Sequence, residues 1–349
     1  MPKDNENIPP VADELIAHAD PPSFSPDQMV RCEECLRANP PTRVNCLYCA
    51  AILPTDETTI HLQKPSLRPL EKWEQGYNNI LWPPPANVSE PGLSEAAALL
   101  RLATADLARI LDLKMPLPVA RAATLEEALL VQRRLTKLGI ATRIVPDAEL
   151  GAEDTPSTRV RAIEFDDTGI RASRTSETAA HHIQWSDFEL LVAGRLITRR
   201  FELHEQNRAR SEASIVDASE FFADESVFEL HTKTLNLPCR FSANSFDFSC
   251  LGKMKTLLAG ENLTILLNRF CENAPQAERD ESYKLVRKAL EVVWPSQQQH
   301  ESSGWRRERP GKYTVGSATE TSNERQFSRY SRLRYCLHVE AGMKKNEDA

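Results

Sequence analysis

The chain has 349 residues, of which 41% are hydrophobic and 27% charged, and its formal net charge is −7. This length is sufficient for two or three small domains. No basic segment followed by an apolar run opens the sequence, and no apolar stretch reaches about 18 residues, which disfavours secretion and membrane spanning.

The distribution of prolines indicates separate modules. The chain holds 23 prolines and 12 glycines, and consecutive prolines occur at 9–10, 21–22, 40–41 and 83–85. Such runs form stiff, extended connectors. Residues 1–27 are rich in acidic groups and show little apolar pattern, so we expect them to be disordered.

Cys32, Cys35, Cys46 and Cys49 form a C-x2-C…C-x2-C array. Two thiolates separated by two residues can reach one metal from a single tight turn, and two such turns complete the tetrahedral sulfur shell that Zn2+ prefers. The array therefore predicts one bound Zn2+ and favours a cytoplasmic location, where cysteines stay reduced. Four protein ligands leave no open position for water or substrate, so we expect no catalysis at this metal.

The full spacing of this array reads C-x2-C-x3-N-x6-C-x2-C and resembles the Ran-binding-protein type of zinc finger. The resemblance covers about residues 28–54 and implies that loop arginines, here Arg37 and Arg43, read guanine edges in single-stranded RNA. In that family an aromatic residue two positions before the first cysteine stacks on a base, and here this position is Val30. The apolar tail after Cys49 is also similar to small bacterial zinc ribbons, which implies a purely structural module.

The remaining cysteines and the histidines give weaker signals. A free cysteine in apolar surroundings usually behaves as a small buried hydrophobe, so we expect no second metal site from the other four. Neighbouring residues on a strand face opposite sides, so we do not expect His181 and His182 to face the same metal ion or reacting atom. The four cysteines outside the C-x2-C array are Cys239, Cys250, Cys271 and Cys336.

Residues 55–92 are predicted to be a linker that is rich in proline and unusually aromatic. Trp73, Tyr77 and Trp82 lie within it. These rings either pack onto the neighbouring domain or form an exposed docking peptide, and we favour packing.

Residues 93–150 are predicted to form a small α/β domain. Apolar residues recur at helical intervals over 94–111, an extended segment follows over 117–122, and Thr124 with Glu127 three residues later is a capping pattern that opens a helix. Gly139 ends this helix, and 141–145 is a returning strand. The order helix, strand, helix, strand resembles the C-terminal domain of the bacterial ribosomal stalk protein, which implies a compact interaction module.

Residues 156–295 are predicted to form a mostly antiparallel sheet domain with C-terminal helices. The run 158–165 alternates in polarity, 166–169 turns and 170–174 returns, which indicates a hairpin. With a closing helix at about 260–272, the region resembles bacterial pleckstrin-homology-like domains. Acidic residues are interleaved with the hairpin arginines, which does not favour phosphoinositide binding. We expect Trp185 in the core and Phe188 to contribute to folding.

Residues 296–349 are predicted to be a largely disordered basic tail with a short helix over 324–338. Arginines alternate with aromatic rings there, so Arg306, Arg307, Arg329 and Arg332 are candidate contacts to nucleic acid. A second interpretation rests on helical spacing and docks the helix on the protein body with its arginines outward, and we favour it. The apolar residues at helical spacing are Phe327, Tyr330, Leu333 and Leu337.

These patterns predict an α+β multi-domain protein: a small zinc ribbon, a helix-strand-helix-strand module, an antiparallel pleckstrin-homology-like sheet with a C-terminal helix, and disordered termini. We expect a non-enzymatic, Zn2+-binding adaptor with protein partners. The alternative is a protein that binds single-stranded RNA through the finger or the tail.

Overall fold

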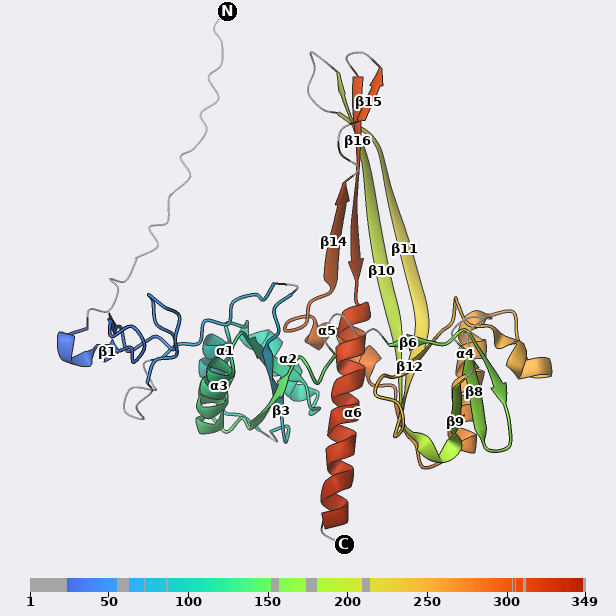
Figure 1. Ribbon diagram of the computed structural model, residues 1–349, viewed down its shortest axis with the longest axis horizontal. Coiled ribbons are helices and arrows are strands. Elements are labelled where there is room, and N and C mark those ends of the chain that lie inside the picture. The colour runs from blue at the N-terminus through green and yellow to red at the C-terminus, as the bar shows by residue number, and fades with distance from the viewer. Residues whose placement is uncertain are drawn as a thin grey trace, which may run out of the picture. The chain divides into compact units, whose positions relative to one another are not determined.

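The structure is a computed structural model that describes residues 24–54, 63–71, 73–85, 87–151, 157–173, 181–208, 214–302, 304, 306–309 and 312–347 (Figure 1). The protein is of the mixed α/β class and forms two compact units, Met1–Lys64 and Pro65–Ala349. Most of the predicted disordered segment 1–27 lies outside the described residues, and its end carries a 3-10 helix, η1 (Pro26–Gln28).

The first unit contains two short hairpins around a cluster of Cys32, Cys46 and Leu53. Strand β1 (Val30–Arg31) pairs antiparallel with β2 (Ala38–Asn39), and a single bridge joins Asn45 to Ile52. Little apolar surface is available to hold so small a core, and a structural metal is the usual substitute.

In the second unit, a three-stranded antiparallel sheet has the order β4-β3-β5. The predicted cap of the helix that begins after Thr124 is present in the structure, because the Thr124 hydroxyl accepts from the Glu127 N–H at 3.3 Å. The elements in chain order are β3 (Tyr77–Leu81), α1 (Glu90–Leu100), α2 (Thr104–Asp112), β4 (Pro118–Ala122), α3 (Leu125–Lys137) and β5 (Thr142–Pro146).

Strand β3 corrects the prediction of a linker over 55–92. It is the central strand of this sheet, and Asn78 within it is buried, donating to the Val145 carbonyl at 3.1 Å and to Asp147 at 2.9 Å. Trp82 packs against the core, as the favoured interpretation expects, whereas Trp73 is exposed.

A second small sheet consists of β7 (Ala162–Phe165), β8 (Gly169–Ser173) and β9 (His181–Gln184), and the first two strands form the predicted hairpin. The Asp166 carboxylate fixes the turn by accepting from the N–H groups of Thr168 and Gly169, both at 2.9 Å. Gly169 is required here, because a Cβ would lie 2.0 Å from the Ile183 carbonyl oxygen.

The predicted closing helix is α4 (Ala259–Asn273), and its Phe270 is buried among aromatic rings. Phe188 is fully buried there, but Trp185, in the 3-10 helix η2 (Trp185–Asp187), is only half-buried. Its ring covers the cluster from the outside, 5.1 Å from that of Phe188, which corrects its expected place in the core. A further 3-10 helix, η3 (Phe248–Met254), precedes α4.

The largest sheet has the order β14-β16-β10-β11-β12-β6, with β13 beside β10 and β15 beside β16. Four of these strands continue away from the helices as a long ribbon, here called the arm (Figure 1). The strands are β6 (Thr158–Arg159), β10 (Phe188–Arg208), β11 (Ser214–Thr232), β12 (Cys239–Ser242), β13 (Glu278–Asp280), β14 (Gln297–Ser302), β15 (Arg306–Arg309) and β16 (Lys312–Ser322).

The predicted disordered tail over 296–349 is largely ordered in the structure. It supplies β14, β15, β16 and the long helix α6 (Glu324–Glu347), which extends well beyond the expected 324–338. The helix docks on the body as its apolar spacing predicts, because Phe327, Tyr330, Leu333 and Leu337 are all buried. No described helix is long and apolar enough to span a bilayer.

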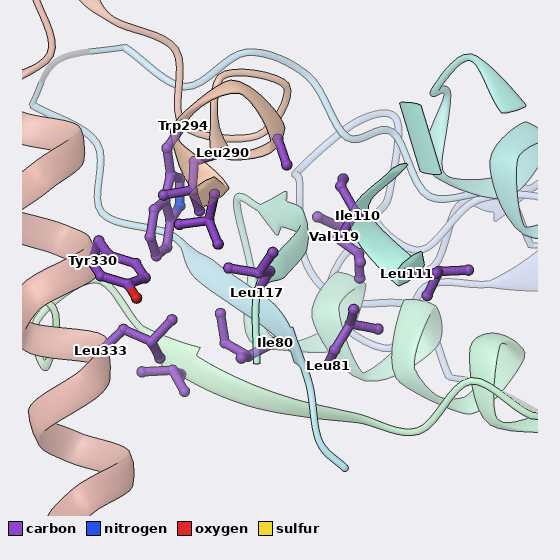
Figure 2. Packing of buried hydrophobic residues seen from close by; sticks show 14 of the residues in the cluster. Ile80, Leu81, Ile110, Leu111, Leu117, Val119, Leu290, Trp294, Tyr330 and Leu333 are labelled. Atoms are coloured by element: carbon purple, nitrogen blue, oxygen red, sulfur yellow. The ribbon is translucent and has the colours of Figure 1, made fainter. Parts of the chain in front are cut away.

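One hydrophobic cluster joins the predicted α/β module, the sheet region and α6. Figure 2 shows Tyr330 and Leu333 of α6 beside Ile80 of β3 and Leu117, the residue before β4, with Trp294 alongside. Trp294 follows α5 (Tyr283–Leu290), and its indole N–H donates to the Asn78 side chain at 2.9 Å. The predicted α/β module, part of the sheet region and α6 therefore share one core, which differs from the expected chain of separate modules, and a second cluster lies within the sheet region.

Candidate metal centre

The two cysteine pairs lie in turns of the same geometry. The Cys32 N–H donates to the Arg37 carbonyl at 3.0 Å, and the Cys46 N–H donates to the Ala51 carbonyl at 2.7 Å, five residues on in each case. The residue after each second cysteine is left-handed, Leu36 and Ala50 both having φ of 61°. Each pair is thus a knuckle whose backbone closes on itself and points both thiols to one side.

The four Sγ atoms meet within 4.8 Å of one another. The Cys32 and Cys49 sulfurs are 3.6 Å apart, and those of Cys35 and Cys46 are 3.5 Å apart. With metal–sulfur bonds of about 2.3 Å, the corners of a tetrahedral zinc site lie about 3.8 Å apart. The predicted cysteines therefore form a four-sulfur site of the size and donor type that suits this metal.

Asn39 links the two knuckles. Its side-chain N–H2 donates to the Arg37 carbonyl of the first knuckle at 2.9 Å and to the Cys46 sulfur of the second at 3.4 Å, while its oxygen accepts from the Leu47 N–H at 2.8 Å. The side chain is fully buried. The sequence pattern includes this asparagine, but a role for it requires the fold.

The thiols differ in their acidity. Burial raises the pKa of Cys46, but N–H donors from Tyr48, Cys49 and Asn39 outweigh it and lower the pKa to about 6. The pKa of Cys49 is lowered by the Ala51 N–H, yet burial and the three neighbouring thiols together raise it to about 12. Four clustered thiols do not all ionise without a cation, because neighbouring thiolates repel one another. A metal would therefore bind with release of the protons that these thiols still carry.

The two arginines that the finger resemblance singles out lie on the ribbon surface. The Arg37 guanidinium sits 4.7 Å above the centre of the exposed Tyr48 ring, and Arg43 is exposed as well. Tyr48 lies between the two cysteines of the second knuckle, so the ribbon carries an exposed aromatic ring, although not at the position of Val30.

The predicted tail contacts to nucleic acid divide into two pairs. Arg329 is buried and lies 3.7 Å from the Asp147 carboxylate, and Arg332 packs against Gly151, where burial lowers its pKa. The burial of Arg329 corrects its predicted contact to nucleic acid, whereas the contact of Arg332, which is half-buried, stays a prediction. Arg306 and Arg307 belong to β15 at the far end of the arm, and Trp305 lies outside the described residues.

The other cysteines offer no comparable group in the described part of the chain. Cys239 is buried as expected, whereas Cys250, Cys271 and Cys336 are partly buried. Burial raises the pKa of Cys250 to about 11 and also raises that of Cys336, which keeps both thiols protonated and unreactive.

A buried polar network lies where β11, β12 and α6 meet. Glu229 pairs with Arg240 at 2.7 Å, and the His231 Nε2 lies 2.8 Å from the Ser331 hydroxyl. Burial lowers the pKa of His231 to about 4 despite the nearby Glu229 carboxylate. His231 and Ser331 are inaccessible to a substrate, so the network holds elements together rather than forming a catalytic pair.

The chain matches no known family model, no curated protein and no solved structure. The resemblances of the finger, the small α/β module and the sheet region therefore stay predictions from the sequence.

Proposed function

We propose that this chain is a zinc-binding interaction protein in which the metal has a structural role. The observation that carries the proposal is the four-sulfur cluster built by two matching knuckles. A shell of four cysteine sulfurs has no vacancy for a reacting water or substrate, which supports a role without catalysis at the metal. The cofactor would be Zn2+, held by Cys32, Cys35, Cys46 and Cys49.

The ribbon surface supports a protein partner. Four large apolar side chains are exposed in a module of only a few dozen residues, and each lies in a knuckle or within three residues of one. Exposed apolar groups held by a rigid scaffold are typical of protein contacts. They are Leu36, Leu47, Tyr48 and Ile52.

The metal and the partner surface can be tested on the full chain. We expect one zinc per chain by elemental analysis, lost when Cys46 and Cys49 are both changed to serine. Proteins captured from native lysate after nuclease treatment should be lost with Leu47→Asp plus Tyr48→Asp and retained with Leu125→Asp, an exposed leucine outside the ribbon. If the Leu47→Asp plus Tyr48→Asp variant captured the same proteins as the wild type, the adaptor role would be contradicted. Absence of zinc from the purified chain would contradict the metal site.

One observation favours a second candidate, single-stranded nucleic acid at the end of the arm. The strand register sets Lys312 of β16 directly opposite both Arg208 of β10 and Arg309 of β15. The register therefore gathers several basic residues at this end of the arm, and clusters of basic residues are typical of contacts to a phosphate backbone. Arg306 and Arg307 lie on the same short strand as Arg309.

Charge reversal separates this candidate from RNA reading by the ribbon. Arg306→Glu, Arg309→Glu and Lys312→Glu together should reduce the affinity for a labelled single strand about tenfold or more at low salt. Arg37→Ala with Arg43→Ala should leave it nearly unchanged. The reverse result would assign binding to the ribbon, and no binding by the wild type would remove nucleic acid as a partner.

A further inference from the structure

The segment Lys253–Leu258, which comprises the end of η3 and the link to α4, exposes three large apolar side chains in five residues. Leu257 has a relative exposure of 103%, Leu258 of 60% and Met254 of 50%. A leucine as accessible as in an open chain is unusual in an ordered loop. Exposed apolar side chains gathered in one place mark a surface that contacts something else.

Hydrogen bonds fix this loop in its exposed form. The buried Asn262 side chain accepts from the Thr256 N–H at 2.7 Å and donates to the Thr256 carbonyl at 2.9 Å. The Leu258 N–H donates to the Thr256 hydroxyl at 3.2 Å. Because a buried amide holds Thr256 on both sides, Leu257 is presented outward by a defined backbone rather than by a loose one.

The ends of the loop are anchored in the core. Phe248 and Leu251 are buried on the η3 side, and Leu263 is buried one turn into α4. Gly252, with φ of 53°, makes the sharp bend that turns the chain outward after Leu251. The apolar tip is therefore a rigid projection from a packed body.

The charge around the tip is positive. Lys253 and Lys255 are exposed on either side of Met254, and residues 248–260 include no aspartate or glutamate. The N-terminus of the 15-residue helix α4, which carries a partial positive charge, follows directly at Ala259. The nearest acids are Asp247 before the loop, which is hydrogen-bonded to Ser249, and Glu261 in the first turn of α4, so the two lysines leave the loop with a net positive charge.

We propose that this loop inserts into the surface of an anionic lipid bilayer and attaches the protein peripherally to it. Leucine and methionine side chains would enter the boundary between headgroups and acyl chains, while the lysine ammonium groups would meet lipid phosphates and carboxylates. A fully protruding aliphatic tip with flanking lysines suits the soft, negatively charged bilayer interface.

This mode differs from recognition of one lipid headgroup. The hairpin arginines that could line a headgroup pocket have other contacts: Arg171 lies 3.5 Å from Asp166, and Arg159 lies 3.1 Å from Glu324. Binding is expected to depend on the overall negative charge of the membrane and on apolar insertion, with little preference among anionic headgroups.

The test uses full-length, zinc-loaded protein and extruded vesicles of phosphatidylcholine with or without phosphatidylserine. The wild type should sediment with the serine-lipid vesicles. Leu257→Asp with Leu258→Asp should reduce its partitioning about tenfold or more, and Lys253→Glu with Lys255→Glu should reduce it in a salt-dependent way. All four side chains are exposed, so each variant should keep the wild-type melting temperature.

The matched control is Leu285→Asp. Leu285 of α5 is 64% exposed and neighbours Lys284, yet it lies outside the loop, so this variant should sediment like the wild type. A second readout is the fluorescence of the tryptophan introduced by Leu257→Trp, whose emission should shift to the blue when the phosphatidylserine vesicles are added.

Three results would overturn the proposal. The wild type could fail to sediment with any vesicle. Vesicle binding could be lost in the lysine variant but retained in the leucine variant, which would show adsorption by charge without insertion. Finally, the leucine variant could lose a co-purifying protein while keeping its vesicle binding, which would assign the loop to a protein partner.

Discussion

Asn39 is the residue at which the two halves of the metal site meet. Its amide contacts the backbone of one knuckle and the Cys46 sulfur of the other, so it positions a ligand without being one. Partners of this kind typically change metal affinity about 10- to 100-fold when removed.

Asn39→Ala is therefore expected to weaken zinc binding by at least about tenfold, measured by competition with a colorimetric chelator. Asn45→Ala is the matched control, because Asn45 bonds the Ala50 carbonyl near the surface at 3.2 Å and contacts no sulfur. Equal affinities for the two variants would show that Asn39 has no part in holding the site.

His231 predicts a pH dependence of folding. Its pKa is lowered by burial to about 4 in the folded protein, against about 6.5 when unfolded. Between these values the unfolded chain binds the proton and the folded one does not, so stability falls as pH drops from about 6.5 to 4. The loss should be about 3 kcal/mol.

The measurement is urea unfolding at both ends of this pH window. His231→Gln keeps a donor toward Ser331 but cannot titrate, so its unfolding free energy should vary less with pH than that of the wild type. His181→Gln, at an exposed histidine, should retain the full loss. A wild-type slope preserved in His231→Gln would assign the titration to other groups.

Individual contacts of charged residues were the least predictable part of the molecule. Arg329 belongs to an arginine-rich run that is typical of a nucleic-acid tail, yet it is buried beside Asp147. Nothing local in a sequence marks an ion pair between residues so far apart. The four cysteines could be assigned because their partners lie in one short segment and their chemistry is restrictive.

At the scale of elements, periodic helices could be predicted and isolated strands could not. Helix α3 has a cap, an apolar stripe and a terminating glycine, and its structure agrees with all three. Strand β3 has five residues, two of them asparagines, and is followed by three consecutive prolines at 83–85. Its burial depends on Val145 and Trp294, which no local pattern reveals.

The crossing of β10 and α6 depends on a glycine. A Cβ at Gly194 would lie 2.5 Å from a Phe327 ring carbon and 2.9 Å from a Tyr283 ring carbon. Gly194→Ala should therefore destabilise the protein by about 2 kcal/mol through overpacking. Gly342→Ala, in α6 with open space around it, should be neutral or slightly stabilising. Thermal unfolding of both variants checks the difference in sign.

At the scale of the whole molecule, the two compact units should respond separately to loss of metal. Strong chelation should unfold the ribbon, since its metal-binding free energy is also its folding free energy. The unit 65–349 has its own clusters of buried side chains and should keep its cooperative melt. Hydrogen exchange before and after chelation checks this, and deprotection throughout 65–349 would contradict it.

The sequence predicts the class of the molecule better than its division into parts. The sequence pattern predicts a four-cysteine module, an α/β region and an antiparallel sheet, and the structure contains all three. Their integration depends on α6, whose arginine-rich outer positions resemble a disordered tail while every third or fourth residue is buried. The composition of this segment indicates its charge, and only the helical spacing of its apolar residues indicates that it is buried.

The cluster that joins Ile80 to Leu337 has a consequence for how the protein is made. At a synthesis rate of about 5–20 residues per second, Ile80 leaves the ribosome roughly 10 to 50 seconds before the helix that covers it. During that interval the apolar face of β3 and β4 is open to aggregation or to chaperones. The ribbon, completed within the first 64 residues, can meanwhile fold and load its metal on the nascent chain.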